Sequence, residues 1–98
     1  MTLNKCQRYF VHKSKANGLN NICGKEIYRR RTLLKPYVSQ NALAAKLQLL
    51  GLDMDKNAIQ RIESGKRYIV DIELLAFAKI FGIEVSELYP DKPIKFGE

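Results

Sequence analysis

The sequence predicts an all-α domain of five short helices, and three kinds of observation support this fold class. Apolar residues recur at helical spacing, suitable caps precede the periodic segments, and glycine or proline follows them. No interior segment has a credible strand pattern. The chain has 98 residues, 46% of them hydrophobic, which suits one compact domain rather than two.

The first helix is expected over about residues 24–34. Asn20 or Asn21 would cap its start, and Pro36 prevents much continuation beyond its end. Its apolar face contains Cys23, Ile27 and Leu34. The preceding residues, 1–22, show no sustained period, so we treat them as an N-terminal arm of unknown order.

The second helix is expected from about Gln40 to Leu50. Ser39 is a good N-cap, and Gly51 is a natural end because glycine readily adopts a positive φ. The apolar positions at helical spacing are Leu43, Leu47 and Leu50. The pattern therefore predicts a helix with one apolar face.

The third helix is expected to begin after Asp55 and to end at Ser64 and Gly65. Asp55 would cap it and place a negative charge at the positive end of the helix dipole. Met54 and Ile59 have the spacing of a hydrophobic staple, which fixes the entry angle of a helix. The face opposite Ile59 and Ile62 is entirely hydrogen-bonding or cationic: Lys56, Asn57, Gln60 and Arg61.

Two further helices complete the domain. Asp71 would cap the fourth helix, and Gly82 would end it. Its core stripe has i, i+3, i+4, i+7 spacing: Leu74, Phe77, Ala78 and Phe81. Ser86 would cap one last helical turn before Pro90. The tail, residues 91–98, has no period, and we expect it to be loose.

The charge of the chain favours an acidic partner. The formal net charge is +7, the pI is about 9.6, and the charge is unevenly placed. Residues 1–35 carry nine Lys or Arg against Glu26 alone, whereas residues 71–98 have a net charge of −3. The basic surface therefore belongs to the N-terminal half and to the second and third helices.

Composition also argues against several classes of protein. Cys6 and His12 would be the only nucleophile and base available, and no third group would orient them, so we expect no enzyme and no catalytic residue. Two cysteines and one histidine are too few for a closed zinc site, so we expect no metal, no cofactor and reduced thiols. No apolar run is long enough to span a membrane, and we expect a cytoplasmic protein.

Four sequence pieces occur in an order and phase that point to a known family. They are Ser39-Gln40, Leu43-Ala44, Ile62-Glu63-x-Gly65-Lys66-Arg67, and Leu74-x-x-Phe77-Ala78-x-x-Phe81-Gly82-Ile83. With them the sequence resembles the lambda-repressor/Cro-like helix-turn-helix family, also called the XRE family, over about two-thirds of the chain. The resemblance implies a compact five-helix DNA-binding domain over residues 23–90, between the arm 1–22 and the tail 91–98.

The resemblance also implies roles for single residues. In this family the third helix lies in the major groove as the recognition helix. Its base-reading positions correspond to Lys56, Asn57 and Arg61, with Gln60 pointing partly sideways. These residue types suit the task, because Arg or Lys can donate to guanine O6 and N7, and Asn can pair with adenine through two hydrogen bonds.

Phosphate contacts are implied on both sides of that helix. Gln40 corresponds to a glutamine that fixes the second helix on a phosphate. After the third helix the family presents backbone amides and basic side chains to a phosphate strand. Arg31 would pair with Glu63, orient the third helix and leave its guanidinium near the DNA backbone. The implied phosphate-binding residues are Gln40, Ser64, Lys66, Arg67 and Arg31.

Two connections depart from the family pattern. The link between the second and third helices is about five residues longer than the usual tight turn, and the connection before Gln40 is about two residues longer. The resemblance therefore does not give the angle of the third helix. Nor does it cover the arm, where Lys5, Arg8, Lys13 and Lys15 would either follow a DNA groove or remain solvated.

The sequence is interpreted as a transcriptional regulator, most simply a repressor, that binds double-stranded DNA as a homodimer. An alternative is an antitoxin or another interaction protein of a two-gene module, whose DNA binding is autoregulatory. The acidic C-terminal region would suit either a dimer surface or such a protein partner. RNA binding without sequence preference is less well supported, because it usually needs an exposed aromatic stacking platform.

Overall fold

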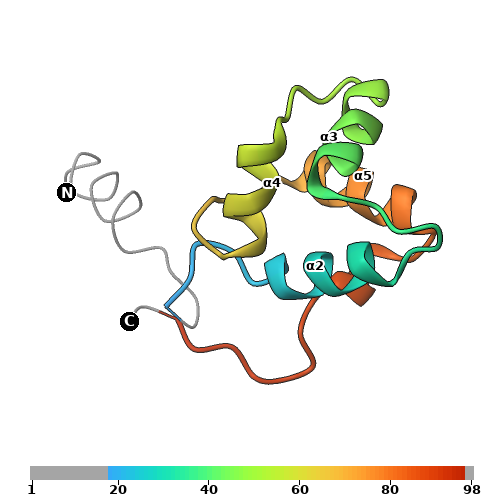
Figure 1. The fold of residues 1–98 in the computed structure, drawn as a ribbon. Coiled ribbons are helices and arrows are strands. Elements are labelled where there is room, and N and C mark those ends of the chain that lie inside the picture. The colour runs from blue at the N-terminus through green and yellow to red at the C-terminus, as the bar shows by residue number, and fades with distance from the viewer. Residues whose placement is uncertain (1–17, 97–98) are drawn as a thin grey trace, which may run out of the picture.

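Residues 18–96 are described in a computed structural model of the chain, and they form four α-helices and one 3₁₀ turn (Figure 1). The elements are α2 (Gly24–Leu33), α3 (Gln40–Leu49), α4 (Lys56–Glu63), α5 (Asp71–Phe81) and η1 (Val85–Leu88). The predicted all-α class is confirmed. The fifth predicted helix is not confirmed: the last turn, predicted after Ser86, is a 3₁₀ turn that begins at Val85. The Glu87 carboxylate accepts from the backbone N–H of Glu84 at its start, at 3.0 Å.

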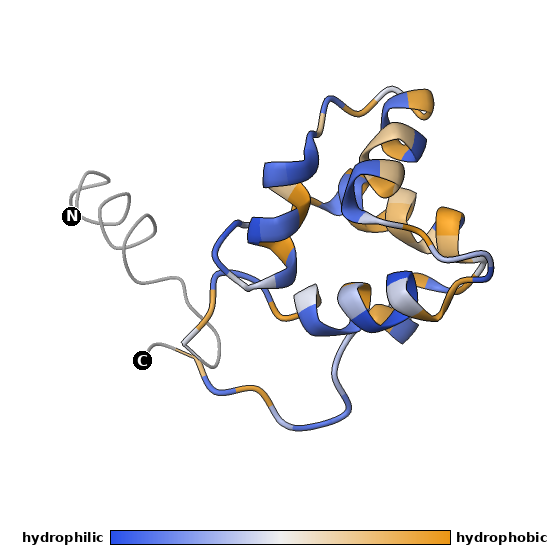
Figure 2. Cartoon of the chain, viewed as in Figure 1, coloured by the Kyte–Doolittle hydropathy of each residue, from blue (hydrophilic) through white to orange (hydrophobic). Residues whose placement is uncertain are grey.

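The helices enclose one apolar core, to which every element contributes (Figure 2). Its largest fully buried side chains are Phe77, Ile27, Leu43, Leu47, Met54, Ile59, Ile62 and Leu88. Leu50, predicted on the apolar face of the second helix, is instead exposed, since α3 ends at Leu49. The chain therefore buries the faces that its helical periodicity predicts, apart from the end of α3.

The starts of α3 and α4 follow their predicted caps. Ser39 Oγ accepts from the backbone N–H of Ala42 at 3.1 Å, and Asp55 Oδ1 accepts from that of Ala58 at 2.8 Å. Each side chain satisfies one of the amide groups left unpaired in a first helical turn. Both elements therefore begin at the residue that local sequence specifies.

The start of α5 differs from the prediction. Asp71 is the first helical residue, and the cap position is Val70. The Glu73 carboxylate reaches back and accepts from the backbone N–H of Val70 at 3.1 Å. Arg67 in turn donates to both Glu73 oxygens, at 3.0 and 3.1 Å. The helix is therefore capped by its own third residue, held by an arginine from the preceding segment.

Residues 19–22 of the predicted arm pack against the domain. The cap position of α2 is Cys23 rather than the predicted Asn20 or Asn21, but Asn21 Oδ1 accepts from the backbone N–H groups of Cys23 and Gly24, at 3.1 and 2.7 Å, and so serves the start of the helix. Asn20 instead donates to the backbone oxygen of Lys66 at 2.8 Å. The packed domain therefore begins before residue 23. Cys6, His12 and the four basic residues of the arm lie outside the described residues.

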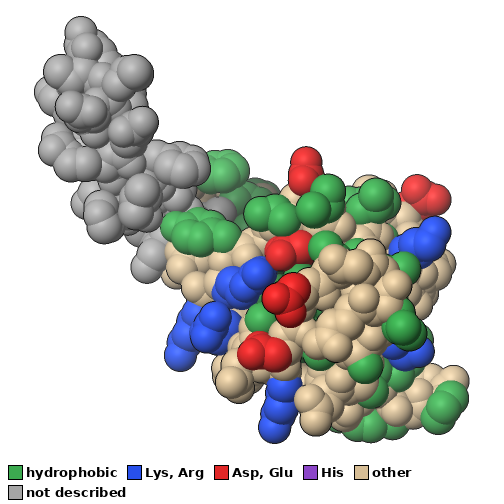
Figure 3. All heavy atoms as spheres, turned by 90° about the horizontal axis from the view of Figure 1, so that it is seen from above, with side chains coloured by type: hydrophobic (Ala, Val, Ile, Leu, Met, Phe, Trp, Pro, Cys, Tyr) green, Lys and Arg blue, Asp and Glu red, His purple; other side chains and the backbone are tan. Residues whose placement is uncertain are grey.

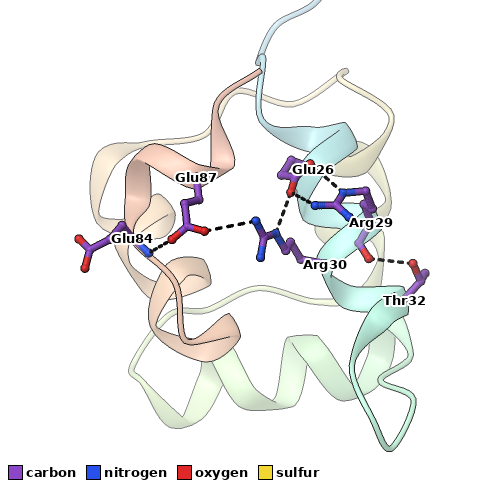
Figure 4. A network of polar contacts seen from close by, with 6 residues as sticks. All are labelled: Glu26, Arg29, Arg30, Thr32, Glu84 and Glu87. Carbon is purple, nitrogen blue, oxygen red and sulfur yellow. Dashed lines mark hydrogen bonds and ion pairs between the residues drawn. The ribbon is translucent and has the colours of Figure 1, made fainter. Parts of the chain in front are cut away.

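An ion-pair network joins α2 to η1 (Figure 4). Glu26 accepts from Arg29 at 2.8 Å and from Arg30 at 2.7 Å, and Arg30 also reaches Glu87 at 3.5 Å. The hydrogen bonds from Arg29 hold the pKa of Glu26 below its usual range. Exposed pairs of this kind contribute only about 0 to 1 kcal/mol each. The two arginines are thus engaged with carboxylates beside η1.

Candidate nucleic-acid interface

The two sides of α4 differ in burial. Ala58, Ile59 and Ile62 are buried in the core. The predicted base-reading residues Lys56, Asn57, Gln60 and Arg61 are all exposed. Their positions are one and three to four residues apart, which places them on a common helical face. The structure therefore brings these four side chains together on the outside of α4.

The long link between α3 and α4 is an ordered turn. The backbone N–H of Leu52 donates to Leu47 O at 3.0 Å, and Gln48 Nε2 donates to Met54 O at 2.8 Å. Met54 is 2% exposed and belongs to the core with Ile59, as a hydrophobic staple requires. The extra residues of this link are thus held at both ends, and α4 starts from a fixed point.

The Arg31 and Glu63 side chains form a buried ion pair between α2 and α4. Arg31 Nε and Nη2 donate to the two carboxylate oxygens at 2.6 and 3.0 Å. Arg31 Nη1 donates to Val38 O at 3.0 Å and to the Tyr37 hydroxyl at 3.3 Å. The hydrogen bonds to Glu63 raise the pKa of the Arg31 guanidinium further, although burial opposes the charge.

This burial corrects one predicted role of Arg31. The predicted pair with Glu63 is present, but only 3% of Arg31 is exposed. A phosphate group cannot approach a guanidinium that is enclosed in this way and already donates to internal oxygens. We therefore do not retain Arg31 among the phosphate-binding residues.

Gln40 joins the same pair from α3. Its Nε2 donates to Glu63 Oε1 at 2.9 Å, and the residue is half-buried. An amide nitrogen carries two N–H bonds, so one remains for an outside acceptor. Gln40 is thus oriented by Glu63 at the first position of α3, where the resemblance to the XRE family implies a phosphate contact.

The segment 64–67 directs its backbone amides into α4. The backbone N–H groups of all four residues donate to carbonyl oxygens of α4, at distances of 2.9 to 3.2 Å. The expected contact of these amides with phosphate is therefore wrong for this structure, because each already has an acceptor.

The side chains of this segment differ in their availability. Ser64 Oγ donates to Arg61 O at 3.2 Å. The Arg67 guanidinium is engaged by Glu73 and by Tyr68 O, whereas Lys66 is exposed. Lys66 is therefore the most accessible cation of the segment.

The surface charge agrees with this arrangement. Seen from above, Lys and Arg side chains gather over α4 and the segment after it, with acidic side chains beside them (Figure 3). The basic side chains from α4 and the following segment are Lys56, Arg61, Lys66 and Arg67. A stripe of this sign on one helix and its neighbouring loop favours a polyanion.

Sequence reasoning missed several residues that position this face. They are Asn20 and Asn21 beside the end of α4, Tyr37 beside Arg31, Gln48 in the α3–α4 link, and Glu73 beside Arg67. Only Asn20 and Asn21 carry a local signal, as possible caps. The partners of Asn20 and Asn21 lie more than 40 residues away, and no local pattern encodes such contacts.

Three further features of the described residues concern metal binding, membrane insertion and thiol reactivity. Between residues 18 and 96 no group of three or more His, Cys, Asp or Glu side chains is placed to hold a metal ion. No helix of that region has the length and apolar character to cross a membrane. Cys23 is a free, buried cysteine, and burial raises the pKa of its thiol to about 11. A reactive thiolate is therefore disfavoured at this position.

Comparison of the chain with protein-family models, curated proteins and solved structures finds no match. The resemblance of the sequence to the XRE family therefore stays a prediction, and the functional argument depends on the geometry of α3, α4 and the segment 64–67.

Proposed function

We propose that this protein binds double-stranded DNA sequence-specifically, with α4 as a recognition helix in the major groove. The observation that carries the proposal is the exposed polar face of α4, opposite a fully buried apolar side. A helix with such a face matches the width of the major groove and supplies donors to base edges. The buried Arg31–Glu63 pair supports the proposal, since it fixes α4 against α2.

Each part of the interface has a chemical task. Lys56 and Arg61 would donate to guanine O6 and N7, and Asn57 would pair with adenine. Gln40 on one side of α4 and Lys66 on the other would hold phosphates, which position the protein without reading sequence. Ser64, Arg67 and Gln60 are secondary contacts, because the first two already bond internally.

The regulatory role is that of a repressor. A homodimer on a two-fold site would place two copies of α4 in successive major grooves, about 34 Å apart. Occupying a promoter in this way blocks transcription without a ligand or a cofactor. The proposed role is thus transcriptional regulation by site occupancy.

Selection from a random duplex pool tests the proposal. We expect the wild-type chain to enrich two related half-sites about one helical turn apart, and we expect Lys56→Ala/Asn57→Ala/Arg61→Ala to lose that enrichment. A variant without the exposed cations Lys46 and Lys79 on α3 and α5 serves as the control and should enrich the same site. Failure of the wild type to enrich any sequence would contradict the proposal.

An antitoxin-like function is supported by one specific observation. Ile72 and Leu75 on α5 are each 61% exposed, within the acidic C-terminal part of the chain. Exposed apolar side chains of this kind suit a protein partner. A chain that shifts its selected duplex alone, as a folded homodimer, supports the regulator. Duplex binding that requires a protein encoded beside it supports the antitoxin-like function.

A further inference from the structure

The Asn21 side chain connects the start of α2 to the end of α4. Its Oδ1 accepts from the backbone N–H groups of Cys23 and Gly24. Its Nδ2 donates to Ile62 O at 3.0 Å and to Arg67 O at 2.8 Å. One amide group thus serves the start of one helix and holds the last turn of another together with the segment that follows it.

Asn20 makes matching contacts with the same segment. Its backbone N–H donates to Gly65 O at 2.9 Å, and its Nδ2 donates to Lys66 O at 2.8 Å. The carbonyl groups of three successive residues, Gly65 to Arg67, therefore each accept a hydrogen bond from Asn20 or Asn21. We call these two residues the asparagine clamp.

Two glycines allow this close approach. A Cβ at Gly24 would collide with the backbone oxygen of Ile62. Gly65 has φ +82°, and a Cβ there would lie 2.8 Å from Leu19 Cδ2. Any other residue at Gly24 would push the start of α2 away from the end of α4. At Gly65 it would have to adopt a strained positive φ and displace the Leu19 side chain. The clamp thus depends on a tight backbone contact as well as on hydrogen bonds.

The clamp acts on the part of the interface that the proposed function assigns to phosphate. The amides of the segment 64–67 point into α4, and its carbonyls at Gly65, Lys66 and Arg67 are held by the clamp. The path of the backbone through Lys66 is therefore fixed from both sides. The exposed Lys66 side chain starts from this fixed backbone, and the same contacts set the end of α4.

We propose that Asn20 and Asn21 are positioning residues of the DNA interface, which hold Lys66 against a phosphate. This inference rests on the proposed function. It assigns a task to two residues that touch neither bases nor phosphates.

Asn21→Asp should keep the hydrogen bonds at the start of α2 and remove those to the end of α4 and the segment after it. An aspartate keeps the Oδ1 acceptor for Cys23 and Gly24, but it has no donor for Ile62 O and Arg67 O. We expect the affinity for the selected duplex and for random duplex to fall by a similar factor, about tenfold, since two hydrogen bonds are lost. The base preference should stay as in the wild type. Asn20→Asp removes the side-chain donor to Lys66 O and places a carboxylate at the buried, unpartnered Oδ1 position of Asn20. It is a second variant that keeps the test open if Asn21→Asp does not fold.

A double-mutant cycle distinguishes positioning from general loss of stability. Lys66→Ala should reduce the slope of log K against log salt by about one phosphate. Asn21→Asp should lower that slope similarly, and Lys66→Ala/Asn21→Asp should lose little more than either variant alone. Ile80→Val, which shortens a partly buried side chain of α5 packed against the core, serves as the control and should lower the melting temperature without changing the slope.

The outcomes separate the inference from the proposed function. If the wild type binds duplex DNA and Asn21→Asp and Asn20→Asp bind it equally well below their melting temperatures, the positioning role is overturned and the function stands. The positioning role would also be overturned if the losses of duplex affinity caused by Asn21→Asp and Lys66→Ala were additive in the double variant. If the wild type binds no duplex, both the function and the inference fail.

Discussion

At the scale of single residues, the Glu63 carboxylate connects three helices. It accepts from Arg31 of α2 and from Gln40 of α3, and it belongs to α4 itself. Both charges of the pair are about nineteen-twentieths buried as side chains. Desolvation of two buried charges is costly, so the pair is tolerated because nearly all of its donors and acceptors are satisfied.

Removal of this carboxylate tests that description. We expect Glu63→Ala to lower the free energy of unfolding by about 3 to 5 kcal/mol, because the Arg31 guanidinium stays buried without its counter-charge. Urea unfolding measures the loss. Asp53→Ala, at an exposed carboxylate of the α3–α4 link, is the control and should change stability by no more than about 0.5 kcal/mol. Equal effects of the two substitutions would contradict a stabilising role of the pair.

Because of Cys23, the free energy of unfolding is expected to fall with rising pH in the alkaline range. Burial raises the pKa of this thiol to about 11 from 9.0, so above pH 9 the unfolded chain releases a proton that the folded chain retains. The contribution is fully present below about pH 9 and is lost as the pH rises to about 11, by about 3 kcal/mol in total. The difference in unfolding free energy between the wild type and Cys23→Ala should therefore shrink over this range. A constant difference would show that the thiol does not titrate on unfolding.

At the scale of elements, the sequence predicts what local chemistry determines. Ser39 and Asp55 act on amides three residues away, and the observed starts of α3 and α4 follow them. The start of α5 was misplaced by one residue because its cap depends on Glu73 and on Arg67, which compete with the local signal of Asp71. Local patterns thus predict helices better than they predict the ends that tertiary contacts decide.

The contacts of the asparagine clamp are the part of the candidate site that could not be predicted from the sequence. The exposed face of α4 follows from periodicity, and the Arg31–Glu63 pair followed from the family resemblance. The contacts of Asn20 and Asn21 with residues 62–67 follow from neither, because nothing near an asparagine specifies a carbonyl oxygen 41 to 46 residues later.

Substitutions on α4 should show which of its residues contribute to sequence preference and which contribute to general affinity. Arg61→Ala is expected to cost about 1 to 3 kcal/mol on the best site and much less on random duplex, because the proposed role of Arg61 is to contact a base. The melting temperature should hold, since Arg61 is exposed. A base-by-base binding profile together with a thermal melt provides the measurement. A uniform loss over all sequences would indicate that the longer α3–α4 link turns α4 away from the bases.

At the scale of the whole molecule, charge is separated along the chain. The first 35 residues and α4 are basic, whereas the C-terminal part from Asp71 is acidic. Such separation orients a protein toward a polyanion before contact and favours one face in the encounter. The acidic part contains the exposed Ile72 and Leu75 of α5. It is therefore suited to contact a second copy of the chain or a protein partner.

Salt dependence tests this orientation. The affinity for a selected duplex should fall linearly on a log–log plot against salt, with a slope of about −0.9 per neutralised phosphate. Titrations followed by fluorescence anisotropy between low and physiological salt give the slope. A flat dependence would contradict phosphate binding by Lys66. Removal of Lys79 on α5 should leave the slope unchanged.

The asparagine clamp also affects the order in which the chain can assemble during synthesis. Residues 20–21 emerge from a ribosome long before residues 62–67, yet the final position of α4 requires both. Bringing the two ends of such a long segment together costs chain entropy, and the contacts between the ends offset this cost only after both ends are present. A nascent chain still lacking the Gly65–Arg67 segment is therefore expected to form α2 and α3 without a fixed α4. The proposed capacity to bind DNA would then arise late, after this segment and the core residues of α5 and η1 have been released.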